Sequence, residues 1–217
     1  MIDPGPDVPE HVRALQTVID EAERALILLT HGHADHAEAA TPLAAATGAE
    51  VWGPGEVSAV DHPLADGASV DTDAGRLVAV ATPGHAREHL CFHWPERRAL
   101  FAGDTLLGVG DTTWVAEYPG CVADYLDSLE RLRGLALDVI YPAHGPPLSD
   151  PADALDRFEA HRRFRIRQVR EVLLARPEAD VEDVLDAVYG DSVSPRMRSA
   201  ARRSLGALLE HARAVPD

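Results

Sequence analysis

The stretch Thr30-His31-Gly32-His33-Ala34-Asp35-His36 places three histidines and one aspartate within six residues. The apolar residues 25–29 precede it and have the length of a buried strand, whereas the alanine-rich residues 37–46 follow it and favour a helix. The cluster is therefore predicted to lie where a strand ends and a helix begins, which is where α/β proteins often carry functional groups. Because the four side chains share one short turn, they can converge on a point.

The composition describes an acidic protein with one sizeable core. The 217 residues are enough for that core and a small second unit. The formal net charge is −16, and all 20 basic residues are arginine. Residues 1–150 hold 24 acidic residues and eight arginines, whereas residues 151–217 hold twelve of each. Because the acidic body is a poor surface for a nucleic-acid backbone, DNA is not an expected partner.

The sequence shows no targeting or membrane segment. No apolar run is long enough to cross a bilayer, and residues 1–4 have neither the basic nor the apolar part of a signal peptide. The two cysteines, Cys91 and Cys121, are isolated and form no Cys-x-x-Cys pair. We therefore expect a reduced, cytoplasmic setting without a membrane partner, and cysteines that pack as small buried hydrophobic side chains.

The pattern of the opening stretch recurs, because further predicted strands are followed by histidine or aspartate beside glycine. Glycine lets the backbone turn sharply and approach a bound group closely. Seven candidate ligands are too many for one tetrahedral zinc ion, so they predict two metal ions that share one carboxylate. Two such ions can hold a bridging hydroxide and polarise the bond under attack, which is hydrolytic chemistry. The candidates are His31, His33, Asp35, His36, His85, Asp104 and His144.

The run His-x-His-x-Asp-His, followed in order by Gly-His, Gly-Asp-Thr and Ala-His-Gly, resembles the metallo-β-lactamase fold superfamily. The resemblance covers residues 1–150 and implies an α/β fold, the αββα sandwich, with a dinuclear metal site. It implies that His31, His33 and His85 bind the first metal. Asp35, His36 and His144 would bind the second. Asp104 would bridge the two ions, so the candidate catalytic carboxylates are Asp35 and Asp104.

Two further polar residues accompany these motifs. Asp3, in Asp3-Pro4-Gly5, matches an early aspartate of the superfamily, which implies a buried group beside the ligands rather than a ligand. His89 lies four residues after His85 and is either a similar supporting group or ordinary polar packing. Two zinc ions are the expected cofactors, although sites that contain carboxylates also take iron or manganese.

A finer resemblance is to the β-lactamase-like endoribonuclease branch, which carries a small winged-helix-like C-terminal domain. It rests on the segments 82–85 and 141–146, on His89, and on a helical tail that contains His161 and Arg162. Relatives of this branch include thioesterases, and glyoxalase II shares the metal motif, so the branch does not fix the substrate. The predicted domains are residues 1–150, which are catalytic, and residues 151–217, which are helical and winged-helix-like without an obvious wing.

The beginning of the sequence departs from the superfamily pattern. Members of the superfamily have a few strands before the Asp-Pro-Gly segment, and in this sequence only Met1 and Ile2 precede it. The catalytic domain is therefore expected to lack its first strands. Because the loss of a sheet edge exposes apolar side chains, we expect this chain to be less stable than one extended upstream.

Three functions remain open. Hydrolysis of a small-molecule ester or thioester comes first, because the acidic body offers no path for a polyanion. Cleavage of single-stranded RNA comes second, and its only candidate contact face is an arginine-rich helix, which is equally typical of a solvated face with internal salt bridges. A non-catalytic metal-binding module is the third. The arginines of that helix are at positions 157, 162, 163, 165, 167 and 170.

Three residues are candidates for contact with the substrate. Trp114 and Tyr118 lie between Asp104 and the next predicted helix, where they either line a pocket or pack beneath a loop. His161 lies on the tail helix, where it either faces the cleft, as the resemblance implies, or is an ordinary histidine without a role at the site. The sequence predicts no oligomeric state.

Overall fold

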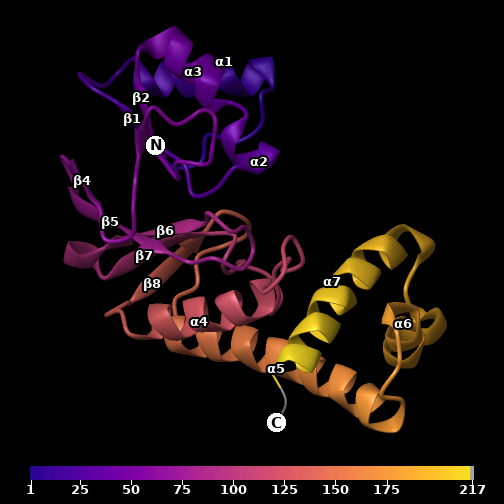
Figure 1. Ribbon diagram of the computed structural model, residues 1–217. Helices are drawn as coiled ribbons and strands as arrows, with labels where there is room; N and C mark the ends of the chain where they lie inside the picture. The colour runs from indigo at the N-terminus through magenta and orange to yellow at the C-terminus, as the bar shows by residue number, and fades with distance from the viewer. Residues whose placement is uncertain (216–217) are drawn as a thin grey trace. The chain divides into compact units, whose positions relative to one another are not determined.

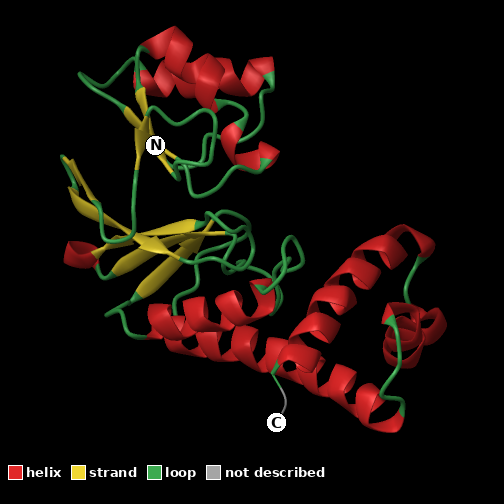
Figure 2. Ribbon diagram, viewed as in Figure 1, coloured by secondary structure: helices red, strands yellow, loops and turns green. Residues whose placement is uncertain are grey.

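A computed structural model describes residues 1–215 (Figures 1 and 2). The chain forms two compact units. The first consists of residues 1–82, 88–109 and 136–151, and the second of residues 83–87, 110–135 and those from 152 onward. None of the helices in the described chain is both long enough and apolar enough to cross a lipid bilayer. The predicted domain boundary at residue 150 stays a prediction.

The first sheet of the first unit is parallel, with the strand order β1-β2-β3. Helices α1 and α3 lie side by side next to it (Figure 1). They bury Ile19 and Leu43 in one core with Ile27 of β1 and Val51 of β2, which explains why these short segments are apolar. The predicted helix over residues 37–46 is two helices, α2 and α3. The bounds are α1 Pro9–Ile19, β1 Leu26–Leu28, α2 Ala34–Ala37, α3 Ala40–Thr47, β2 Glu50–Gly53 and β3 His62–Pro63.

The second sheet of the first unit has the strand order β4-β5-β6-β7-β8. Strands β4 to β7 are antiparallel neighbours, whereas β8 runs parallel to β7. Parallel neighbours end at the same edge, so the residues that follow β7 and β8 emerge together. A second core joins Leu28 of the first sheet to Leu77 and Phe92 of the second. The bounds are β4 Ser69–Thr72, β5 Gly75–Ala81, β6 Leu90–Trp94, β7 Ala99–Gly103 and β8 Val139–Pro142.

The second unit is built from helices (Figure 2). Helix α6 begins after Asp180, whose side chain accepts hydrogen bonds from the backbone of Glu182 and Asp183 in a capping box. Helices α6 and α7 pack together and bury apolar residues such as Leu185 and Leu208. No strand follows β8 in the described chain, so the predicted winged-helix form is not confirmed. The bounds are α4 Cys121–Arg133, α5 Pro151–Ala175, α6 Val181–Tyr189 and α7 Pro195–Ala214.

Candidate metal centre

The histidine-rich stretch forms the turn between β1 and α2, as its sequence predicts. His33 is extended, with φ −66° and ψ 149°, and α2 begins at the next residue. The turn folds the imidazoles onto one another. The ring of His31 lies 4.5 Å from that of His33 and 4.2 Å from that of His36, between centroids. His31 and His36 are buried, so these polar rings face the interior of the first unit rather than solvent.

Asp104 and His144 meet this turn because they follow the parallel strands β7 and β8. His36 Nε2 lies 3.5 Å from Asp104 Oδ1, and His144 Nε2 lies 3.5 Å from the same oxygen. His144 Nε2 also lies 3.3 Å from Asp35 Oδ2. Five of the predicted ligands therefore converge within the first unit, and His33 lies beside them.

The donor set fits divalent metal ions. Two groups each offer three ligand atoms that lie within 4.8 Å of one another: His31 with His36 and Asp104, and Asp35 with His36 and His144. Imidazole nitrogen and carboxylate oxygen are the ligands that zinc, iron and manganese take in proteins. Because the two groups share His36, they indicate two neighbouring positions rather than two separate sites.

The electrostatics of the cluster favour a cation. Burial would lower the pKa of His36, but hydrogen bonds to Asp104 and Asp3 outweigh it and raise this pKa to about 10. The carboxylates thus hold a positive charge in a buried place, which in the apo protein is a proton on His36. A divalent cation would benefit from the same field.

Asp3 contacts two of the candidate ligands, His36 directly and His31 through Thr30. Its Oδ2 accepts a hydrogen bond of 2.9 Å from His36 Nδ1 and one of 2.8 Å from Thr30 Oγ1, while its Oδ1 accepts one of 2.8 Å from the Thr30 backbone. Thr30 Oγ1 in turn lies 2.9 Å from His31 Nδ1 and accepts its proton, because its own proton goes to Asp3. One carboxylate therefore directs Nε2 of both His31 and His36 toward the cluster.

His89 is the corresponding support of Asp104. Its Nε2 accepts a hydrogen bond of 3.2 Å from the Asp104 backbone, so its proton is on Nδ1, which donates to Thr82 Oγ1 at 2.9 Å. Gly103, with φ +48°, allows this approach. A Cβ at Gly103 would lie 2.6 Å from His89 Nε2 and 2.7 Å from Thr30 Oγ1. The role of His89 stays a prediction, and these contacts favour a supporting group over unrelated packing.

His85 belongs to the second unit, in the turn of residues 83–87. Its Nδ1 donates a hydrogen bond of 2.9 Å to the Trp114 backbone oxygen. That bond places the proton on Nδ1 and makes Nε2 the nitrogen that suits a metal. Gly84 packs against α4, where an added Cβ would lie 2.6 Å from Tyr125 Cβ. Ser128 Oγ of the same helix donates to the Pro83 oxygen at 2.7 Å.

The three predicted substrate residues also lie in the second unit. The guanidinium of Arg203 lies 4.8 Å from the centre of the Trp114 ring, and that of Arg87 lies 4.1 Å from the centre of the Tyr118 ring. Burial raises the pKa of the Tyr118 hydroxyl, so it stays protonated near neutral pH. Burial and nearby arginines lower the pKa of His161. Their contact with substrate stays a prediction.

Sequence reasoning misplaced Arg162. It grouped this residue with the exposed arginines of α5, but Arg162 is only 3% exposed. Arg157 and Arg163, by contrast, lie on the surface and pair with Asp153 and Glu159 of the same helix. The signal was present in the spacing, because Arg162 falls in a stripe of buried residues at helical intervals. That stripe is Leu155, Phe158, Arg162, Ile166 and Val169.

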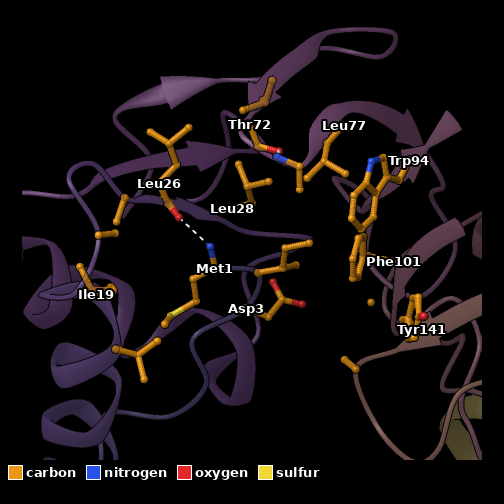
Figure 3. A pocket seen from close by; sticks show the side chains of 18 of the residues that line it. Met1, Asp3, Ile19, Leu26, Leu28, Thr72, Leu77, Trp94, Phe101 and Tyr141 are labelled. Carbon is orange, nitrogen blue, oxygen red and sulfur yellow. Dashed lines mark hydrogen bonds between the residues drawn. The ribbon is translucent and has the colours of Figure 1, made fainter. Parts of the chain in front are cut away.

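A large cavity lies in the first unit (Figure 3). It measures 1260 Å³, and we call it the apolar groove because side chains such as Leu28, Leu77 and Phe101 line it. The amino group of Met1 lies in it and donates to the Leu26 oxygen at 2.9 Å. Asp35, His36 and His144 belong to its lining. Its charged side chains are Asp3, Glu23, Arg24, Asp35, Asp71, Asp73 and His36 when it is protonated.

The sequence matches known proteins over most of its length. Residues 1–144 match the family described as the Metallo-beta-lactamase superfamily. The Lactamase-like protein aptB of Emericella nidulans is 31% identical over 205 residues, which are 88% of this chain and 64% of that protein. The Beta-lactamase-like protein 2 homolog of Caenorhabditis elegans is 31% identical over 207 residues, which are 88% of this chain and 67% of that protein. The chain thus spans about two thirds of these relatives.

Solved structures share the fold. A metallo-beta-lactamase family protein from Thermus thermophilus has a TM-score of 0.79 at 22% identity, over 98% of this chain and 84% of its own. TTHA1623, solved in a di-iron-bound form, has a TM-score of 0.57 at 27% identity, over 73% of this chain and 85% of its own. The predicted α/β fold with two sheets is therefore confirmed, together with helices at its C-terminal end. The chain belongs to the metallo-beta-lactamase superfamily.

Proposed function

We propose that this protein is a dinuclear metal-dependent hydrolase. The observation that carries the proposal is the convergence of Asp35, His36, Asp104 and His144 on the buried turn that holds His31. In this proposal His31, His33 and His85 hold one ion, and Asp35, His36 and His144 hold the other. Asp104 would offer its carboxylate to both. Zinc is the proposed metal, and the di-iron form of the relative TTHA1623 makes iron the alternative.

The residues of the chain have separable tasks in this reaction. When bound, two divalent ions supply Lewis acidity and a nucleophilic water near neutral pH. Asp3 fixes the tautomers of His31 and His36, so that both present Nε2. Asp104 sets the spacing of the site, and His89 holds its backbone in place. A site fixed in this way needs little rearrangement as charge develops on the substrate.

We propose a small-molecule ester or thioester as the substrate. The charge of the apolar groove supports this choice because, apart from Asp35 at the proposed metal, four carboxylates line it against Arg24 and the amino group of Met1. Such a lining repels a polyanion but accepts a neutral acyl group. Single-stranded RNA is the alternative substrate. The burial of Arg162 and the internal ion pairs of Arg157 and Arg163 weaken the proposed RNA-contact face on α5.

The test combines metal analysis with a matched pair of histidine variants. His144 and His62 both lie in the first unit with side chains 47% and 45% exposed. His144→Ala is expected to lose one equivalent of metal and about 100-fold or more in turnover, whereas His62→Ala keeps both. The substrate panel contains a p-nitrophenyl ester, an acyl thioester and a single-stranded RNA.

Each outcome of the panel decides one question. Turnover of the ester or thioester that disappears in His144→Ala supports the proposal. Preferential cleavage of RNA would replace the proposed substrate. Two bound metals without turnover of any substrate would identify a metal-binding module, and wild-type protein that binds no metal would refute the proposal itself.

A further inference from the structure

Arg162 is a buried cation without an acidic partner in the described chain. Its guanidinium Nη2 donates a hydrogen bond of 3.0 Å to the Thr113 backbone oxygen, and it lies 5.3 Å from the centre of the Tyr125 ring. Burial lowers the pKa of this guanidinium. Burial of a charge among neutral partners lowers the stability of the fold, and a methionine or leucine would fill the buried stripe on α5 at a smaller cost in free energy. The position therefore calls for a reason other than core packing.

Both contacts of Arg162 lead to His85 within the second unit. Thr113 precedes Trp114, whose backbone oxygen accepts the proton of His85 Nδ1 at 2.9 Å. The bond from Arg162 holds the peptide between Thr113 and Trp114, and this limits the directions that the carbonyl group of the next peptide can take. On the other side, Tyr125 lies against Gly84, the residue before His85, with 2.7 Å between its Cα and a Cβ built at Gly84.

We propose that Arg162 is a positioning residue for His85. It holds the loop at Thr113 and Trp114, which orients the His85 imidazole, and it contacts Tyr125, which supports the turn at Gly84. In this way the His85 proton stays on Nδ1, and Nε2 points in the direction that suits a metal ligand. Arg203 of α7 adds to the brace through its contact with the Trp114 ring. The C-terminal helices thus support the proposed ligand His85 without contributing a ligand themselves. This inference rests on the proposed function, in which His85 binds a metal.

The test compares Arg162→Met with Arg163→Met in the full chain. Both remove one arginine from α5, but Arg163 is on the surface and pairs with Glu159 of the same helix. The first measurement is the 15N NMR spectrum of the histidine rings without metal, in which His85→Gln identifies the His85 signals. Wild type and Arg163→Met are expected to show the Nδ1–H tautomer of His85. Arg162→Met is expected to show a mixture of tautomers.

The second measurement is the affinity for each metal equivalent by competition with a chromophoric chelator. Arg162→Met is expected to bind one equivalent about 10–100-fold more weakly, in the range of lost orienting partners, while the other equivalent changes little. Arg162→Lys, which keeps a cation that can reach the Thr113 oxygen, is expected to recover part of the loss. If Arg162→Met fails to fold, both measurements are made on Arg162→Lys instead.

The outcomes separate this inference from the proposed function. A folded Arg162→Met protein with an unchanged His85 tautomer and unchanged affinities would overturn the positioning role. Equal weakening of both metal equivalents, or a tautomer mixture in Arg163→Met as well, would also overturn it, because the effect would then be general destabilisation. If wild type binds no metal, the proposed function fails, and the tautomer comparison in the metal-free protein still decides whether Arg162 orients His85.

Discussion

Replacement of Asp3 by asparagine tests how the ligands are oriented. The Asp3→Asn side chain would keep an oxygen for the Thr30 backbone but would present an NH₂ group where Oδ2 now accepts from Thr30 Oγ1 and His36 Nδ1. Two donors cannot face an NH₂ group, so His36 must lose the proton on Nδ1 and carry its remaining proton on Nε2 in order to accept instead. The Thr30 hydroxyl must then donate to His31 Nδ1, which moves that proton to Nε2 as well. One atom exchange thereby blocks the metal-binding nitrogens of two ligands.

The magnitude follows from the number of ligands affected. Loss of one orienting partner costs about 10–100-fold in metal affinity, or about 1.4–2.7 kcal/mol. Because His31 and His36 belong to different metals in the proposed site, both equivalents should weaken by about this factor. The metal-free protein should lose only about 1–3 kcal/mol of stability, since each buried donor finds a new acceptor of poorer geometry.

The assay is chelator competition with zinc, together with urea unfolding of the metal-free protein. Asp7→Asn is the matched control, because Asp7 lies in the same N-terminal segment on the surface. The reasoning is refuted if Asp3→Asn folds and binds both equivalents within about twofold of wild type. Loss of only one equivalent would show that the relay through Thr30 to His31 does not operate.

Three further predictions concern the same centre. His89→Leu should lower the free energy of unfolding in urea by about 1–3 kcal/mol, because the Asp104 backbone N–H loses its acceptor. His89→Gln should recover part of this loss. Equal stability of His89→Leu and wild type would contradict the prediction. Gly103→Ala should lower the melting temperature by several degrees, because the added Cβ would lie 2.6 Å from His89 Nε2 at a φ of +48°. The control is Gly110→Ala, where φ is also positive but no atom lies within 4 Å of the added Cβ. The metal-free protein should lose stability as the pH rises from about 6.5 toward 10. The reason is that the folded state raises the pKa of His36 to about 10, so the proton on His36 stabilises the fold only below that pH. A melting temperature in EDTA that rises over this pH range would refute the prediction.

The candidate ligands could be proposed from sequence because each of their motifs is local. A strand of apolar residues, a glycine and a histidine or aspartate lie within a few positions of one another, and this spacing predicts a strand end with a ligand on it. The helical tail was also predictable, since the apolar residues of α5, α6 and α7 recur at helical intervals. Membership of the superfamily follows from the same local motifs.

Tertiary structure alone decided which atoms of the candidate ligands each neighbouring residue contacts. The bond from Asp3 to His36 spans 33 positions, and that from Arg162 to Thr113 spans 49. No periodicity predicts such pairs, because they depend on which faces of distant elements come into contact. The helical spacing of α5 did place Arg162 in an apolar stripe, but charge alone suggested solvent. Its burial is a property of the packed second unit, where aromatic and backbone groups replace the water that an arginine would otherwise keep.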